Sequence, residues 1–109
     1  MKIKSFPFQT LNWSSIPKEE HKGETGIAYW QTQMLHEIRV RMVEYSPDYK
    51  ADHWCNKGHI IFCIEGEMET ELENGRIMKL TKGMTYFVGD NSDAHRTSTK
   101  DGCKLFIVD

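Results

Sequence analysis

The strongest constraint on the fold of this chain is the alternation of apolar and polar residues along most of its length. The segment HEIRVRMVEY places Ile38, Val40 and Met42 on one face of an extended chain and Arg39 and Arg41 on the other. Successive side chains of a strand point to opposite sides, so a period of two predicts a half-buried β-strand. We expect the apolar face of this strand to meet the core and the two arginines to form a polar face.

Further strands are predicted at short intervals, separated by turn signals. HIIFCIE is a short apolar strand, EMETELE alternates, and Asn74-Gly75 supplies the two-residue turn that favours a hairpin. RIMKL, MTYFV and CKLFIV follow, the last of them after the turn Asp101-Gly102. About eight short strands with turns roughly every eight to twelve residues predict an all-β fold, either a sandwich or a barrel.

The chain of 109 residues is long enough for one domain, but its N-terminal part differs from the rest. Residues 1–26 hold neither a helical nor a strand period, and we expect an arm packed on the domain or on a partner subunit. Residues 27–109 then form the barrel or sandwich. The arm carries Phe6, Phe8, Leu11 and Trp13. So much aromatic surface is unusual in water, and we therefore expect a homodimer.

Charge and composition exclude several classes of partner. Lysine and arginine number 14 against 16 acidic residues, a formal net charge of −2, so we expect no nucleic acid partner. The longest apolar runs are too short to span a bilayer, and we expect no membrane partner. The N-terminus lacks the apolar stretch of a signal peptide, which predicts a cytoplasmic location. Three cysteines, an odd number, favour free thiols or metal ligands over a disulfide framework.

Four residues form the candidate site: His53, Cys55, His59 and His95. His53 and Cys55 are two apart, so they share a face if this segment is extended, and His59 begins the next strand. Imidazole and thiolate suit zinc, iron, nickel or copper. The spacing is not that of a zinc finger, and the alternative interpretation is a set of scattered polar residues at strand ends.

The segment HWCNKGHIIFCIEG resembles the first signature of the cupin superfamily, which reads His-x-His, three or four residues, Glu, six residues, Gly. His53 stands at the first histidine, Cys55 at the second, His59 at the glutamate and Gly66 at the glycine. The two substituted positions still hold residue types that bind metals. The resemblance therefore implies that His53, Cys55, His59 and His95 bind one divalent metal ion.

The second cupin signature is matched more loosely, at Gly83 and His95, with one extra residue between them. The string DHWC, with GHIIFCIEGE and the terminal KLFIVD, is similar to a small bacterial branch of cupin-fold proteins named for a DHCW motif. The resemblance covers roughly residues 40–108 and implies a small cupin-type β-barrel, a double-stranded β-helix or jelly roll, over 27–109. It implies a metal-site layout but no established reaction.

Two functions remain open for such a barrel. The first is a metal-dependent enzyme that acts on a small polar molecule. The second is a non-catalytic barrel that binds or senses a small-molecule ligand and holds a structural metal. Zinc is the first expectation because thiolate and imidazole suit it, with iron or nickel as alternatives. An open coordination position would favour the first function, and a closed four-ligand site the second.

Overall fold

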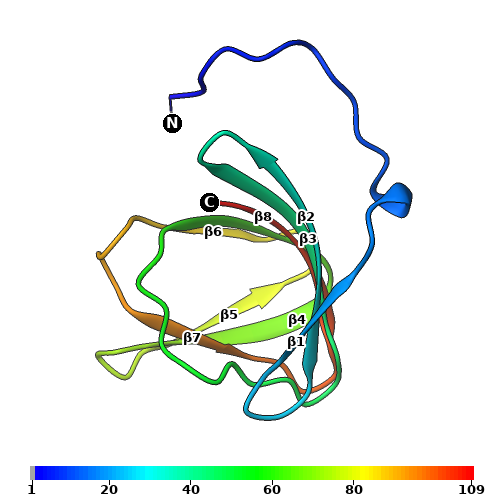
Figure 1. The fold of residues 1–109 in the computed structure, drawn as a ribbon. Coiled ribbons are helices and arrows are strands. Elements are labelled where there is room, and N and C mark those ends of the chain that lie inside the picture. Colours follow the sequence, from blue (N-terminus) through cyan, green and yellow to red (C-terminus); the bar gives the residue numbers. More distant parts are fainter. Residues whose placement is uncertain (1) are drawn as a thin grey trace.

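A computed structural model describes residues 2–109, which form eight strands and one turn of 3-10 helix (Figure 1). The elements are η1 (Trp13–Ser15), β1 (Glu19–Lys22), β2 (Ile27–Leu35), β3 (Ile38–Tyr45), β4 (His59–Leu72), β5 (Ile77–Thr81), β6 (Thr85–Val88), β7 (His95–Ser98) and β8 (Cys103–Val108). The all-β prediction is confirmed. Within the described residues, no helix has the length and apolar character needed to cross a membrane.

Every strand pair is antiparallel, and β4 belongs to two sheets. The first sheet runs β1-β2-β3-β8-β4, with β6 on the other edge of the first half of β4. In the second sheet the later half of β4 lies between β5 and β7. Figure 1 shows the two sheets curving toward each other, so their inner faces form the interior of a barrel.

The two strands expected from HIIFCIE and EMETELE are a single bent strand, β4. Its register against β8 shifts between Cys63 and Glu65, and Gly66 has a φ of +77°. A β-carbon at Gly66 would collide with the carbonyl oxygen of Gly102, so only glycine fits there without a shift. A register shift of this kind bends a strand, which lets β4 serve both sheets.

The hairpin predicted at Asn74-Gly75 forms between β4 and β5, but its loop has three residues instead of two. The N–H of Leu72 donates to the carbonyl of Arg76 at 2.8 Å, so residues 73–75 make the connection. Gly75 has a φ of +89° at the last loop position. A three-residue loop that ends in a left-handed residue is the next most common hairpin after the two-residue turns.

The core lies between the two sheets and is drawn mainly from alternate residues of β3, β4 and β8. On β8 the odd-numbered residues are buried and the even-numbered ones face outward. The buried apolar cluster consists of Val43, Ile61, Cys63, Met68, Leu80, Cys103, Leu105 and Ile107.

The inward face of β3 is the opposite of the one expected. Arg41 and Val43 are buried, whereas Val40 and Met42 are only half-buried. The expectation that Arg39 and Arg41 form an outer polar face is therefore wrong. Their guanidinium groups bind Asp109, the residue after β8, whose side chain is fully buried. A buried carboxylate needs paired charges, and this need turns the arginines inward.

The N-terminal segment contains more regular structure than expected. Residues 19–22 form β1, which pairs with β2 at the edge of the first sheet, so the expectation of no strand in 1–26 is wrong there. The His21 ring stacks on Trp30 with centroids 3.8 Å apart. The part before η1 arches out and returns toward the turn between β2 and β3 (Figure 1), where His36 Nε2 lies 3.2 Å from the carbonyl oxygen of Ser5. Phe8 on this part is 95% exposed.

Candidate metal centre

Three of the predicted site residues, Cys55, His59 and His95, meet inside the barrel. One ligand atom from each lies within 4.8 Å of the other two. Cys55 and His95 are an antiparallel pair, since each backbone N–H donates to the other's carbonyl, at 2.8 and 3.0 Å. Residues directly opposite in such a pair project to the same side. His59 opens β4 beside them, and its ring centroid lies 5.1 Å from that of His95.

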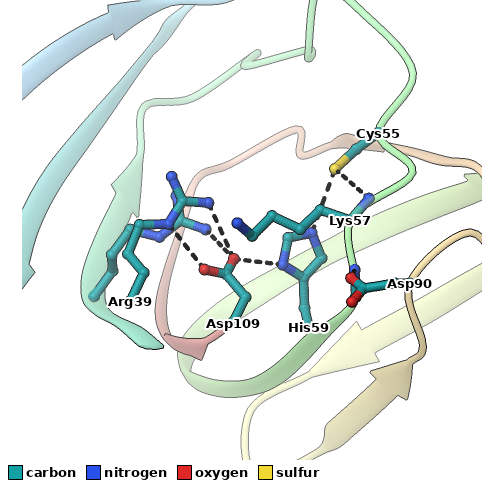
Figure 2. A network of polar contacts seen from close by, with 8 residues as sticks. Arg39, Cys55, Lys57, His59, Asp90 and Asp109 are labelled. Atoms are coloured by element: carbon teal, nitrogen blue, oxygen red, sulfur yellow. Dashed lines mark hydrogen bonds and ion pairs between the residues drawn. The ribbon is translucent and has the colours of Figure 1, made fainter. Parts of the chain in front are cut away.

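Hydrogen bonds to the segment that follows β6 fix the position of the loop before β4. The N–H of Gly58 donates to the Asp90 carboxylate at 2.7 Å, and the N–H of Asn91 donates to the carbonyl of Asn56 at 2.8 Å. The backbone N–H of Lys57 points at the Cys55 sulfur, 3.4 Å away. These bonds hold the thiol and the His59 ring on one side of the loop (Figure 2).

The hydrogen bond of His95 determines its tautomer. Its Nδ1 lies 2.9 Å from the carbonyl oxygen of Asp93, which can only accept, so Nδ1 carries the proton. Nε2 then holds a lone pair, and this atom is buried with no partner among the described residues. Burial lowers the pKa of His95, which keeps the ring neutral near pH 7. A neutral imidazole with a free, buried Nε2 is ready to bind a metal.

His59 is oriented in the same way by a carboxylate. Its Nδ1 donates to Asp109 Oδ2 at 2.7 Å, and its Nε2 lies 3.5 Å from the Cys55 sulfur (Figure 2). A histidine that donates one ring N–H to a carboxylate and offers the other nitrogen is the usual arrangement of a metal ligand. The sequence analysis missed Asp109. Its signal was the alternation of β8, which places residues 103, 105, 107 and 109 on the inward face.

Asp109 is the centre of a charged network (Figure 2). Arg39 binds both of its oxygens, at 2.8 and 3.1 Å, and Arg41 Nη2 donates to Oδ2 at 2.9 Å. Burial alone would raise the pKa of Asp109, but the hydrogen bonds from His59 and Arg39 and the charges of both arginines hold it well below its ordinary value. The carboxylate is therefore ionised and is a strong acceptor for His59.

The structure leaves the fourth predicted residue, His53, outside the group. Its side chain is 78% exposed, and its Nδ1 lies 2.6 Å from the carboxylate of Asp52. It lines the same cavity as the other three residues. A role for His53 as a metal ligand stays a prediction.

The separation of the donor atoms fits a metal ion. With metal–sulfur and metal–nitrogen distances of about 2.3 and 2.0–2.1 Å, a tetrahedral ion holds sulfur and nitrogen roughly 3.5 Å apart. The Cys55 sulfur and His59 Nε2 have that separation. One thiolate and two neutral imidazoles suit zinc and its neighbours, and three protein ligands leave a coordination position open.

The open side of the group faces a cavity of about 280 Å³ inside the barrel. Its walls are aromatic and basic, with Trp30, Tyr45 and Tyr86 among the aromatic residues and Arg41 among the basic ones. The other two cysteines lie apart from it in the core, and burial raises the pKa of Cys103 to about 12. Cys55 is thus the thiol available to a metal ion.

Solved structures share this architecture. A predicted oxalate decarboxylase from Thermotoga maritima matches with a TM-score of 0.77 over 92% of this chain and 96% of its own, at 15% identity. Ectoine synthase from P. lautus matches with a TM-score of 0.75 over 93% of this chain and 76% of its own, at 18% identity. A sugar phosphate isomerase of the cupin superfamily from Silicibacter pomeroyi matches with a TM-score of 0.67, at 13% identity, over 92% and 74%.

This chain has the cupin fold. The predicted barrel of the double-stranded, jelly-roll type is thereby confirmed. No family sequence model and no curated protein sequence matches the chain. The narrower resemblance of this chain to the DHCW branch stays a prediction. At these identities the matches show the fold, so the function must be argued from the site.

Proposed function

We propose that this cupin-fold protein binds one divalent transition metal ion through Cys55, His59 and His95 and uses the open coordination position to hold a small polar molecule. The observation that carries this proposal is the pair of histidines whose Nδ1 protons are both engaged. Each Nε2 therefore carries a lone pair, and one ligand atom of each ring lies within 4.8 Å of the Cys55 sulfur. Hydrogen bonds of this kind are characteristic of metal-binding histidines.

A bound ion would act as a Lewis acid on the molecule in the cavity. The chain's own contribution is to orient the donors. Asp109 and the Asp93 carbonyl hold the two rings, and Trp30 and Tyr86 form part of the cavity wall. This arrangement supports the enzyme hypothesis of the sequence analysis. Zinc is the expected metal, because the donor set of one sulfur and two nitrogens suits it.

The alternative function is a non-catalytic barrel that holds a structural metal. It is favoured by one observation: His53 lines the same cavity and offers a fourth donor. If His53 completes the site, the metal has four protein ligands and no position for a substrate. The His53→Ala variant separates the two functions, because loss of metal affinity means a closed site and retention means an open one.

The proposal is tested by elemental analysis of the full chain purified without a metal-affinity tag. We expect one metal ion per chain in the wild type. Cys55→Ser should lower metal affinity by at least about tenfold, since the hydroxyl is a poorer ligand than the thiolate. The matched controls Cys63→Ser and Cys103→Ser should retain the metal, because both sulfurs lie in the core. Equal occupancy in all three variants would contradict the proposal.

A further inference from the structure

Arg41 is a buried cation on the wall of the metal cavity. Its side chain projects from the inward face of β3, it is only 4% exposed, and it lines the cavity together with Cys55, His59 and His95. Its guanidinium lies over the Trp30 ring, 4.3 Å from the centroid, so the group is held in one place. A buried, rigidly held arginine beside a metal site requires a negative partner.

Asp109 accepts only one of the hydrogen bonds that the Arg41 guanidinium can donate. A guanidinium has five N–H donors, and among the described residues the one side-chain hydrogen bond of Arg41 runs from Nη2 to Asp109. Its Nε is buried without a partner. Arg39 differs, because its Nε and Nη2 donate hydrogen bonds to both oxygens of the same carboxylate. Arg41 therefore has donors left over, and a buried donor without a partner costs free energy.

The charge of the cavity is positive. Its lining contains Arg39, Arg41 and Arg96 and no carboxylate. Asp109 offsets one of the charges on Arg39 and Arg41, and Arg96 is paired with Glu71 at 2.9 Å. A divalent ion bound by one thiolate and two neutral imidazoles adds a further net positive charge. An anion that enters the cavity meets this charge, and Arg41, which has donors left over, is one of the residues of the cavity wall.

The size and walls of the cavity restrict the anion. A volume of about 280 Å³ corresponds to roughly nine water molecules, which is room for a molecule of few heavy atoms. Aromatic walls favour an organic anion over a fully hydrated one. A carboxylate matches the planar, forked donor geometry of arginine and is also an oxygen ligand for a divalent ion.

We infer that the cavity binds a small carboxylate whose negative charge is met by Arg41 and by the metal ion. This inference rests on the metal site proposed above and names the substrate class of that site. Arg41 acts as the anchor that selects a carboxylate over a neutral molecule of the same shape, because the neutral molecule would leave the cation unpaired.

The test uses the full chain loaded with cobalt(II), whose visible spectrum responds to a new ligand, with acetate as probe and acetamide as its neutral counterpart. In the wild type we expect a saturable spectral change with acetate and none with acetamide. At saturating cobalt, Arg41→Gln should weaken acetate binding at least about tenfold, the loss typical of a charge-assisted hydrogen bond. Arg41→Lys, which keeps the positive charge, should lose less of the affinity for acetate.

The matched control is Arg96→Gln, because Arg96 lines the same cavity but already pairs with Glu71. It should bind acetate within about twofold of the wild type. Equal acetate affinity in the wild type and Arg41→Gln would overturn the inference, as would an equal response to acetamide. A wild type that binds cobalt but not acetate overturns the inference alone, whereas a wild type that binds no cobalt overturns the proposed function itself.

Discussion

At the scale of single residues, Asp109 joins the fold to the candidate metal centre. Its fully buried carboxylate accepts from Arg39, Arg41 and His59, and its backbone pairs with that of Arg39. A buried charge is tolerated only when it is paired and hydrogen-bonded, and here the three partners meet that requirement. The same carboxylate keeps the His59 proton on Nδ1. Stability and metal affinity should therefore depend on one side chain.

The substitution Asp109→Asn tests this dependence. It keeps the size of the side chain but removes the charge that pairs two arginines, so we expect a loss of about 3 kcal/mol in the free energy of unfolding. Metal affinity should fall roughly 10- to 100-fold, as is usual when the partner of a ligating histidine is lost. Urea denaturation and metal titration measure the two effects.

The matched control is Asp52→Asn. Asp52 also binds the Nδ1 of a histidine, His53, at 2.6 Å, but both side chains are mostly exposed. An exposed pair contributes little, so the free energy of unfolding should stay close to that of the wild type. If the two variants were equally stable, the buried network would not have the role assigned to it here.

At the scale of elements, the bend of β4 sets both the shape of the barrel and the place of the site. The first half of the strand carries His59 and pairs with β6 and β8, and the second half pairs with β5 and β7. His95 begins β7, so the bend brings the start of β7 toward the sheet that carries His59. Gly66 lies at the bend with a positive φ and no room for a side chain.

We expect Gly66→Ala to destabilise the protein by at least about 3 kcal/mol, because the methyl group meets backbone as well as an unfavourable φ. The matched control is Gly83→Ala, where φ is +87° but nothing lies within 4 Å of the added carbon. In the control the free energy of unfolding should fall by only about 1–2 kcal/mol, because only the unfavourable positive φ contributes. Thermal or urea unfolding of both variants measures the difference, and equal losses would mean that the close approach at Gly66 is unimportant.

At the scale of the whole molecule, the outer face of the first sheet carries an apolar row. Paired residues form a continuous row across four strands, Val40, Val108, Ile60 and Phe87. Ile60 is 42% exposed and Phe87 is 77% exposed. Contiguous apolar surface of this kind is typical of an interaction site. The exposed N-terminal arm adds further apolar surface to the molecule. We therefore keep the expectation of a homodimer and propose this row as part of its interface.

Sedimentation velocity at micromolar concentration tests the assembly. We expect a dimer for the wild type and a monomer for Phe87→Glu, because a charge buried within an apolar interface has no partner to pair with. Ile77→Glu is the matched control, since Ile77 is exposed on β5 of the other sheet, and this variant should remain a dimer. A monomeric wild type would contradict the prediction.

The extent to which the site could be predicted differs from residue to residue. Cys55, His59 and His95 were identifiable because thiols and imidazoles are rare and their spacing follows a known pattern. His53 belongs to the same pattern, yet its ring lies beside Asp52 at the surface. Asp109 belongs to no motif, and its role follows only from the partners that the fold brings to it.

By itself the sequence determined the all-β class, the segments that form most of the strands and the kinds of donor available to a metal, because these depend on local periodicity and residue chemistry. Only the tertiary structure decided which face of β3 turns inward. The alternation Ile-Arg-Val-Arg-Met reads the same for either orientation, and the choice depends on a carboxylate 68 positions away from Arg41. It also decided that HIIFCIE and EMETELE form one bent strand, because the close approach of Gly102 to Gly66 exists only in the folded chain.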